Sequence, residues 1–201
     1  MIPVLAVQDP DRAREMLARV FGFVPGGNGC MEFGGQSVAV VHAGDVPNGM
    51  LRIPLDHVAF AVSDADETCA AYLARDGHLA RAFTPDGPRD IPEFWDNGVR
   101  FVFFDGPDGW PLEFCAKKGT PGRAGHDHFA IRTADIGADE ARLSSIGATP
   151  VAHHRLSSET GSVEVRFLAL GTDMFEVFDE GPHPDVDPDR GWIGLLRSVP
   201  R

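Results

Sequence analysis

Apolar and polar residues follow one another in the same order three times along this chain. Each repeat opens with a short apolar run that predicts a β-strand, at residues 2–7, 57–62 and 128–131. Seven residues after the start of each run stands an aspartate that can cap a helix, namely Asp9, Asp64 and Asp135. A glycine 12 or 13 residues further on can end that helix in the left-handed conformation, namely Gly22, Gly77 and Gly147. The pattern therefore predicts a strand and then a helix in every repeat.

Short segments rich in strand-forming residues follow each predicted helix, and turns of Gly, Pro and Asp divide them. They are CMEF and SVAVVHA in the first repeat, LARAF, VRFVFF and PLEFCA in the second, and TPVAHHRL, SVEVRFLAL and MFEVFDE in the third. Hairpin-connected strands typically show this alternation of runs and turns. Each repeat is therefore predicted as one βαβββ module. The predicted fold class is α+β, with repeated modules that form a cupped mixed sheet.

The segments between the repeats set the predicted limits of the modules. We expect a degenerate N-terminal module, a second module, a third module and a tail, at 1–45, 52–118, 125–181 and 182–201. The tail is acidic and proline-rich at its start, which predicts an irregular segment over the surface. Trp192 and Leu195–Leu196 are its candidate anchors.

The second module carries two residues that apolar strands rarely hold. His57 opens one apolar run, and Glu113 stands in the middle of another. An ionised glutamate inside a buried strand costs several kcal/mol unless a partner compensates it. His128 and Glu176 stand at matching places in the third module. If the two modules form one cup, these two imidazoles and two carboxylates converge and suit a divalent Zn, Ni, Co, Mn or Fe ion.

Each of these residues alone has a more ordinary interpretation. A single histidine at the start of a strand is usually structural or exposed, and a single glutamate in a strand often faces water. The recurrence of both residues in two modules favours the metal site. His126, two residues before His128, is the alternative ligand at that place. The first module has Ile2 and Ala39 at the corresponding positions and therefore offers no ligands.

Composition limits the partners and the location. The net charge of the 201-residue chain is -12 with 18 basic residues, so we expect no nucleic-acid partner. No apolar run is long enough to span a membrane, and the N-terminus lacks the pattern of a signal peptide. Three cysteines without metal-binding spacing indicate a reduced, cytoplasmic setting.

The predicted modules resemble those of the vicinal oxygen chelate superfamily, which includes glyoxalase I, methylmalonyl-CoA epimerase, bleomycin-binding proteins and extradiol dioxygenases. The segments HVAFAVSD and FFDGPDGWPLEF carry the resemblance best, and it extends over about residues 1–180. The spacing is most similar to that of glyoxalase I, with 56 residues from His57 to Glu113, 15 to His128 and 48 to Glu176. The resemblance implies that these four residues hold the metal. The ligand-free first module departs from the usual pattern.

The resemblance also implies a metal-dependent enzyme of the lyase or isomerase kind, acting on a small oxygen-bearing substrate. The metal would bind two substrate oxygens and stabilise the enediolate that forms when Glu113 or Glu176 removes an adjacent proton. A ring-cleaving dioxygenase is one alternative, with Fe(II) held by His57, His128 and Glu176. A non-catalytic protein that holds a drug or metabolite is another, although bleomycin-binding relatives characteristically lack the ligand set.

The odd number of modules bears on assembly. Modules two and three must meet to gather the four ligands, either within one chain or by exchange between two chains. The apolar strands of module one then need a cover, which module one of a second chain could supply by two-fold symmetry. We therefore expect a homodimer, and capping within one chain is the alternative.

The second module contains a long loop, TPDGPRDIPEFWDNG, that the third module lacks. Phe94 and Trp95 in this loop could close over a substrate, or they could simply pin the loop to the surface.

Overall fold

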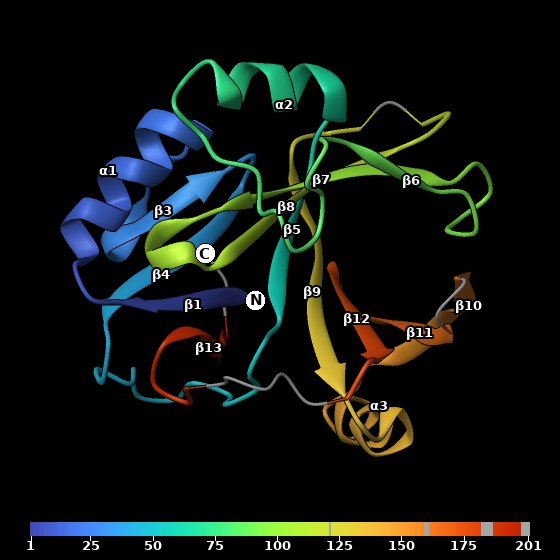
Figure 1. Cartoon of the computed structure of the whole chain (residues 1–201). Coiled ribbons are helices and arrows are strands. Elements are labelled where there is room, and N and C mark those ends of the chain that lie inside the picture. The colour runs from blue at the N-terminus through green and yellow to red at the C-terminus, as the bar shows by residue number, and fades with distance from the viewer. Residues whose placement is uncertain (121, 159–160, 182–186, 198–201) are drawn as a thin grey trace.

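The chain folds into two β-sheets with helices packed against them, which confirms the predicted α+β class (Figure 1). The computed structural model describes residues 1–120, 122–158, 161–181 and 187–197. Its α-helices are α1 (Pro10–Phe21), α2 (Ala65–Leu73) and α3 (Ile136–Ser145). Short 3₁₀ turns lie at Gly27–Gly29 and Pro107–Gly109. Within the described ranges, no helix is long and apolar enough to cross a membrane.

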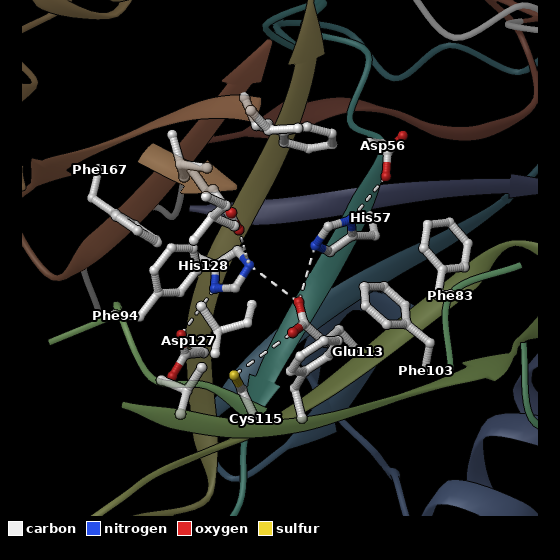
Figure 2. A pocket seen from close by; sticks show the side chains of 18 of the residues that line it. Asp56, His57, Phe83, Phe94, Phe103, Glu113, Cys115, Asp127, His128 and Phe167 are labelled. Atoms are coloured by element: carbon white, nitrogen blue, oxygen red, sulfur yellow. Dashed lines mark hydrogen bonds and ion pairs between the residues drawn. The ribbon is translucent and has the colours of Figure 1, made fainter. Parts of the chain in front are cut away.

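The larger sheet has eight strands and curls into a half barrel in the order β10-β11-β12-β9-β5-β8-β7-β6. Module two supplies β5 (His57–Ala61), β6 (Arg89–Ile91), β7 (Val99–Asp105) and β8 (Pro111–Lys117). Module three supplies β9 (Gly125–Thr133), β10 (Thr149–Ser158), β11 (Gly161–Leu170) and β12 (Asp173–Asp179). Strands β5 and β9 pair antiparallel at the centre, so the two modules join within one chain. The predicted cup is the inner face of this curve (Figure 2).

Module one forms the core of a separate five-stranded sheet in the order β13-β1-β4-β3-β2. Its strands are β1 (Ile2–Val7), β2 (Val24–Pro25), β3 (Cys30–Phe33), β4 (Gln36–His42) and β13 (Gly191–Leu196). The last of these comes from the other end of the chain. The limits of 1–45, 52–118 and 125–181 for the three modules remain a proposal.

The first and last strands of each module pair in the same parallel register. The residues directly paired are Ala59 with Glu113 in module two, Ala130 with Glu176 in module three, and Val4 with Ala39 in module one. In each module the first strand position lies two residues before the first member of the pair, at His57, His128 and Ile2. The structure thus gives Ile2 and Ala39 the places that His57 and Glu113 have in module two.

The end of the chain differs from the prediction of an irregular tail. Gly191–Leu196 form strand β13, while 182–186 and 198–201 lie outside the described residues. Of the predicted anchors, Trp192 and Leu195 are buried, whereas Leu196 is only partly buried. The Trp192 indole Nε1 donates to the backbone carbonyl of Pro111 at 3.0 Å, which satisfies its polar atom inside the core. Burial of these side chains explains why this short segment is ordered as a strand.

Strand β13 pairs with β1 as β9 pairs with β5. Both pairs are antiparallel, and both have a β-bulge, which begins beyond Val4 on β1 and beyond Ala59 on β5. Both added strands also begin with a glycine at positive φ, Gly191 at 78° and Gly125 at 149°. A Cβ on Gly191 would lie 2.5 Å from the Trp110 ring, so no larger residue fits there. The tail therefore stands where the first strand of a further module would pair.

The helix caps form as predicted, with one difference at the end of α2. Asp9, Asp64 and Asp135 each accept from backbone N–H groups of the first helical turn. Gly22 ends α1 in the left-handed conformation, with φ at 75°. After α2, Asp76 takes that conformation in place of Gly77, with φ at 61°. Gly77 is needed for a different reason, because a Cβ there would lie 2.8 Å from the Tyr72 carbonyl oxygen.

The predicted strand in LARAF is wrong. Leu79 makes only an isolated bridge to Phe104, and turns follow it as the N–H groups of Phe83 and Thr84 both donate to the Ala80 carbonyl. The second strand of module two is Arg89–Ile91, inside the segment predicted as a long loop.

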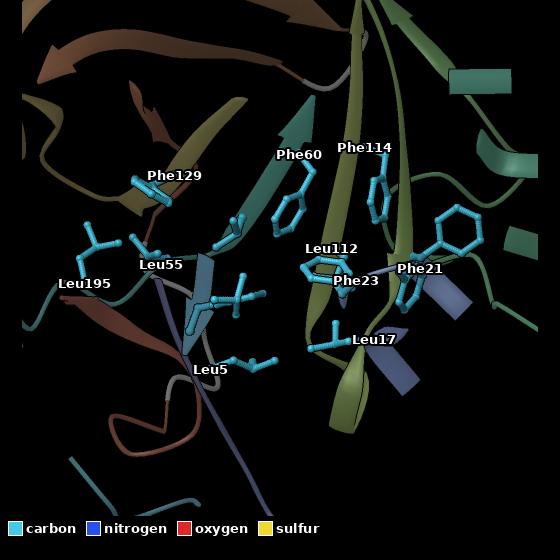
Figure 3. Packing of buried hydrophobic residues seen from close by; sticks show 14 of the residues in the cluster. Leu5, Leu17, Phe21, Phe23, Leu55, Phe60, Leu112, Phe114, Phe129 and Leu195 are labelled. Atoms are coloured by element: carbon cyan, nitrogen blue, oxygen red, sulfur yellow. The ribbon is translucent and has the colours of Figure 1, made fainter. Parts of the chain in front are cut away.

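A cluster of phenylalanines packs the small sheet and α1 against the outer face of the large sheet (Figure 3). Phe21 of α1 stacks on Phe114 of β8 with ring centroids 5.7 Å apart. Phe60 of β5 meets Phe23 edge to face at 5.1 Å. Phe21, Phe60 and Phe114 are among the largest fully buried side chains of the described residues. The outer face of the large sheet is thus filled with apolar groups, which leaves its inner face for the site.

Candidate metal centre

The four residues singled out by the sequence lie on the inner face of the large sheet. His57 opens β5, Glu113 lies in the middle of β8, His128 lies in β9 and Glu176 lies in β12. Alternate residues of a strand point to opposite faces, so the neighbours of Glu113, Leu112 and Phe114, enter the apolar core instead. The four residues retain between 3% and 8% of their accessible surface. The structure therefore places four ionisable groups at the buried base of the cup.

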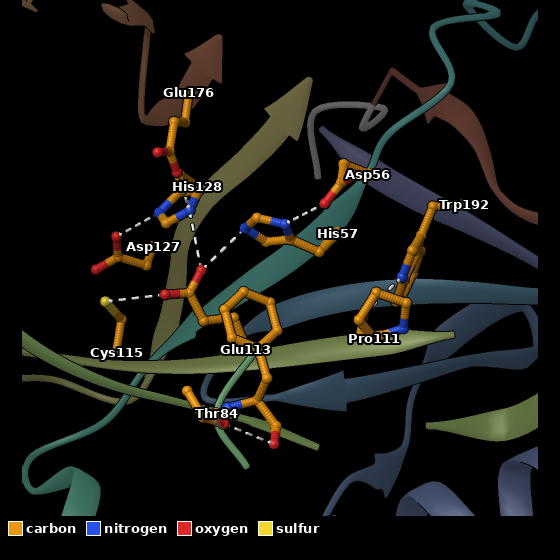
Figure 4. A network of polar contacts seen from close by, with 11 residues as sticks. Asp56, His57, Thr84, Pro111, Glu113, Cys115, Asp127, His128, Glu176 and Trp192 are labelled. Carbon is orange, nitrogen blue, oxygen red and sulfur yellow. Dashed lines mark hydrogen bonds and ion pairs between the residues drawn. The ribbon is translucent and has the colours of Figure 1, made fainter. Parts of the chain in front are cut away.

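Their polar atoms converge on a small volume (Figure 4). Oε2 of Glu113 lies 3.0 Å from Nε2 of His57 and 3.2 Å from Nε2 of His128. Oε2 of Glu176 lies 2.7 Å from the same Nε2 of His128. One ligand atom from each of His57, Glu113 and His128 lies within 4.8 Å of the others. Glu113 thus bridges the two imidazoles, and Glu176 approaches from the third module.

The two histidine Nε2 atoms show that this donor set fits a metal ion. Both atoms are fully buried, and neither has a hydrogen-bond partner in acceptable geometry despite the nearby carboxylates. A buried polar nitrogen without a hydrogen bond costs about 1–3 kcal/mol, and a metal ion bound by both nitrogens would offset that cost. Two imidazole nitrogens and two carboxylate oxygens are the donors that divalent transition metals take. His57, Glu113, His128 and Glu176 could therefore hold one such ion.

An aspartate orients each of the two imidazoles through its other nitrogen. Nδ1 of His57 donates to Asp56 and Nδ1 of His128 donates to Asp127, each at 2.9 Å. A carboxylate acceptor at Nδ1 fixes the tautomer that presents the Nε2 lone pair to the site. The sequence reasoning missed both aspartates. Their signal was available, because an Asp-His pair opens the second and the third module alike.

A β-bulge brings Asp127 to the same side as His128. Ala59 of β5 is opposite His128, while the next residue, Phe60, is opposite His126. Asp127 is the extra residue of β9 and lines the cup together with His128. In a regular strand these neighbours would point to opposite faces. The bulge therefore makes the contact between adjacent residues possible.

The electrostatics of the cup keep the histidines and Glu113 charged without a metal. Burial would lower the pKa of His57, but the hydrogen bond to Asp56 and the Glu113 carboxylate raise it to about 9. Burial likewise opposes the charge of His128, yet Glu176 and Glu113 hold its pKa well above the ordinary value. Burial would raise the pKa of Glu113, but His128 and His57 hold it well below its usual range. The groups thus stabilise one another as a charged cluster.

The alternative ligand His126 has a different role. Its Nε2 accepts from the backbone N–H of Met174 at 3.0 Å, so the ring is used to join β9 to β12. Burial lowers the pKa of His126 to about 4, which keeps it neutral. The bulge at Asp127 shifts His126 out of the face that His128 occupies. His126 does not line the cup.

Cys115 is a further group at the base of the cup. Its Sγ lies 3.6 Å from Oε1 of Glu113, and burial raises the pKa of the thiol well above its ordinary value. The thiol can therefore donate to the carboxylate and stays protonated. All three cysteines lie in the described part of the chain, and all are free.

Aromatic rings form the walls of the cup on both sides. Phe103 of β7 pairs with Glu113, and Phe167 of β11 pairs with Glu176, so the two rings occupy equivalent places in the two modules. Phe94 and Trp95 both line the cup and contact Phe167, with ring centroids 5.1 and 5.0 Å apart. Trp95 takes a positive φ of 58°, which is unusual for a bulky residue. The long loop of module two therefore bridges to module three across the cup.

Comparisons with known proteins agree with this geometry. No protein-family model matches the chain, and no curated protein sequence matches it. Among solved structures, glyoxalase I from Zea mays is similar at a TM-score of 0.62 and 17% identity, over 88% of this chain and 65% of that one. A variant of the same maize enzyme is similar at a TM-score of 0.63 and 15% identity, over 94% of this chain and 71% of that one. A variant of 4-hydroxymandelate synthase from Streptomyces coelicolor is similar at a TM-score of 0.56 and 14% identity, over 90% of this chain and 71% of that one.

The chain thus spans less than two thirds of the maize glyoxalase I chain. At such identities the likeness shows the fold alone, and that fold is the predicted one. The curled sheet, the repeated register and these neighbours together show that the chain has the fold of the vicinal oxygen chelate superfamily.

Proposed function

We propose that the protein is a metal-dependent enzyme that moves a proton within a small substrate bearing two adjacent oxygens. The observation that supports it most is the pair of buried Nε2 atoms, of His57 and His128, which lack hydrogen-bond partners and face two carboxylates. The proposal extends to a lyase or isomerase reaction in a cytoplasmic protein. The neighbouring structures include a glyoxalase I, whose fold this chain shares.

The chain's own residues would divide the work as follows. His57, His128 and Glu113 would hold the metal with Glu176 as a more loosely held fourth ligand, and Asp56 and Asp127 keep the two imidazoles in the binding tautomer. A divalent ion at this place supplies Lewis-acid stabilisation of the negative charge that develops on the substrate oxygens.

Glu176 is the better candidate for the base. Glu113 contacts both imidazoles and the Cys115 thiol, whereas among these groups Glu176 contacts His128 alone. A carboxylate held by fewer partners is freer to take a proton from the carbon beside a substrate carbonyl and to return it to the neighbouring carbon. The surrounding aromatic side chains exclude water from this transfer.

The ring-cleaving dioxygenase is the second candidate function. It would use Fe(II) held by His57, His128 and Glu176, all of which line the aromatic cup. One neighbouring structure is a variant of 4-hydroxymandelate synthase, and that likeness concerns the fold alone. Iron content and a requirement for oxygen would separate this reaction from an isomerase.

Metal analysis of protein purified without chelator tests the proposal. We expect about one metal ion per chain in the native protein. His57→Ala and Glu176→Ala should each abolish binding, because each removes a donor from a buried set. Full metal occupancy in either variant would show that the site is assigned wrongly.

Two histidine variants serve as controls. His126→Ala should keep the metal, because His126 binds the Met174 backbone and does not line the cup. His153→Ala should also keep it, since that side chain is 62% exposed on β10. Circular dichroism of every variant would show whether a lost metal reflects lost ligands or lost structure.

A further inference from the structure

We infer that the cup binds the uncharged, ring-sized apolar part of a substrate and excludes substrates that carry an anionic group next to that ring. This inference rests on the proposed function, which supplies the metal and the two adjacent oxygens, and it adds the substrate class. Phe103, Phe167 and Leu156 are its specificity-determining residues.

The walls above the metal ligands are apolar on both sides (Figure 2). His57 meets the Phe103 ring edge to face at 4.8 Å, and His128 meets the Phe167 ring in the same manner at 6.0 Å. Further rings and branched aliphatic side chains complete the lining, namely Phe83, Ile91, Val99, Leu156, Val163 and Val165. An apolar substrate group gains about 25 cal/mol for each Å² that it buries against such a wall. The paired phenylalanines therefore provide a slot for a flat group that points at the metal ligands.

The size of the cavity limits that group. Its volume is about 180 Å³. An apolar cavity of about 150 Å³ in another protein holds one benzene molecule. The cup thus has room for one six-membered ring with two oxygen substituents.

The charges of the cup disfavour an anion. Of the described residues, those that line it include the acids Asp56, Glu113, Asp127, Glu176 and Glu180 but no lysine or arginine. A bound divalent cation would balance the two ligand glutamates and leave the aspartates negative. Lys117 lies 3.7 Å from Asp127 and over the Trp95 ring, so its charge is already shared. Apart from the metal and the two imidazoles, which the acidic residues already outnumber, a carboxylate or phosphate on the substrate would find no counter-charge on the lining of the cup.

A second cavity, which shares Asp56 and Phe83 with the cup, is lined by Arg132, Arg142 and Arg190. Arg132 donates to the Gly181 and Glu180 carbonyls, and Arg142 donates to the Arg52 carbonyl. The guanidinium groups of Arg132 and Arg142 are therefore already engaged. The Asp56 carboxylate lines both cavities and adds a negative charge between them.

Two matched ligands test the inference by anaerobic calorimetric titration of the metal-loaded protein at pH 7. Catechol and 3,4-dihydroxybenzoate present the same ring and the same adjacent oxygens, but only the second carries a carboxylate. We expect catechol to bind at least tenfold more tightly. The affinity for catechol should also be at least tenfold higher than that for 1,2-ethanediol, which has the paired oxygens without the ring. Equal or tighter binding of either competitor would overturn the inference.

A variant that introduces a positive charge on the wall tests the same preference. Leu156→Lys places a cation on the lining of the cup and should shift the preference toward 3,4-dihydroxybenzoate by at least tenfold. Val151→Lys is the control, because Val151 lies on the same strand but is 50% exposed and does not line the cup. An unchanged preference in Leu156→Lys, or an equal shift in Val151→Lys, would contradict the assignment of the wall.

Phenol and benzoate, titrated into the chelated protein, separate this inference from the proposed function. If the protein binds no metal but still prefers phenol, the metal function fails and the apolar slot stands. If it binds metal but takes benzoate as well as phenol, the slot fails and the metal site stands.

Discussion

Asp127 accepts a hydrogen bond at 2.9 Å from Nδ1 of His128, the residue that directly follows it. The contact exists because β9 bulges at Asp127, and the bulge turns the Asp127 carboxylate toward the cup. In a regular strand this carboxylate would point to the opposite face of the sheet. Asp127 is buried, so its hydrogen bond to the imidazole is not weakened by competing water. The neighbouring residue therefore sets the direction of the His128 ring before any ligand binds.

Removing this acceptor should weaken metal binding without removing a ligand. Asp127→Leu should lower the metal affinity by about 10- to 100-fold, as is typical when an orienting carboxylate is lost. Asp127→Asn should have a smaller effect, because the amide oxygen can still accept from Nδ1. Competition titration with a metal-binding dye measures both. Asp66→Asn, on a carboxylate that pairs with Arg100 at the surface, is the control and should leave the affinity unchanged.

Much of this site could be predicted from the sequence because two of the repeats carry the same residue types at equivalent positions. His57, Glu113, His128 and Glu176 could be predicted because two modules carry a histidine at the start of the first strand and a glutamate in the last strand. The cap at Asp64 was found because its chemistry is local. The bulge could not be predicted, since it depends on how β9 pairs with β5 across the module boundary. Strand β13 was missed for a related reason, because its order comes from the distant Pro111 carbonyl and the core around it.

Metal affinity should rise with pH up to about 9. In the metal-free cup the pKa of His57 is about 9, because Asp56 and Glu113 raise it. A metal binds the unprotonated Nε2, so it must displace this proton at any lower pH. The apparent affinity should therefore increase about tenfold per pH unit for each proton displaced. Calorimetry in buffers of different ionisation enthalpy counts the protons directly. An affinity that stops rising near pH ~6.5, the ordinary value for histidine, would contradict the coupling.

The interactions of His57 with Asp56 and Glu113 should also stabilise the metal-free protein over a defined pH range. A raised pKa in the folded state means that the contribution of His57 is fully present below the unfolded value of 6.5 and is lost as the pH rises through about 9. We expect the free energy of unfolding of chelated protein to fall between pH ~6.5 and ~9. Urea titrations at several pH values measure this slope. The variant His57→Gln should have a flatter slope in this range, and an equal slope would show that other groups cause the decrease.

Trp192 should be the principal anchor of β13. It is 2% exposed, and its indole Nε1 donates to the Pro111 carbonyl. Trp192→Ala should cost about 3–5 kcal/mol of unfolding free energy, the usual range for truncating a buried aromatic residue. Trp192→Phe should cost less, because it keeps most of the apolar contact and loses the hydrogen bond. Leu73→Ala is a suitable control, because Leu73 is 46% exposed and its loss should change stability by no more than about 0.5 kcal/mol.

The homodimer remains a prediction, and the fold now restricts how it could form. Strand β13 already pairs with the outer edge of β1, so two copies cannot meet through that edge unless β13 moves. The other face of the small sheet carries a smaller apolar cluster, in which Val4, Ala6, Ala39 and Ile193 are buried within the chain while Ile2 and Val41 beside them are only partly buried. Leu51 already bridges to Leu195 on the other edge of β13, so partly buried side chains such as Ile2 and Val41 are what this face still offers to a two-fold contact.

Light scattering over a range of concentrations should give twice the chain mass of 21.7 kDa. The metal ligands all come from modules two and three of one chain, so dilution to monomers should leave the metal content per chain unchanged. Val41→Lys should favour the monomer by burying a charge in the contact, whereas Val24→Lys, at a residue that is 56% exposed, should not. A mass of one chain at every concentration, with metal still bound, would show that module one is covered within its own chain by β13 and needs no second copy.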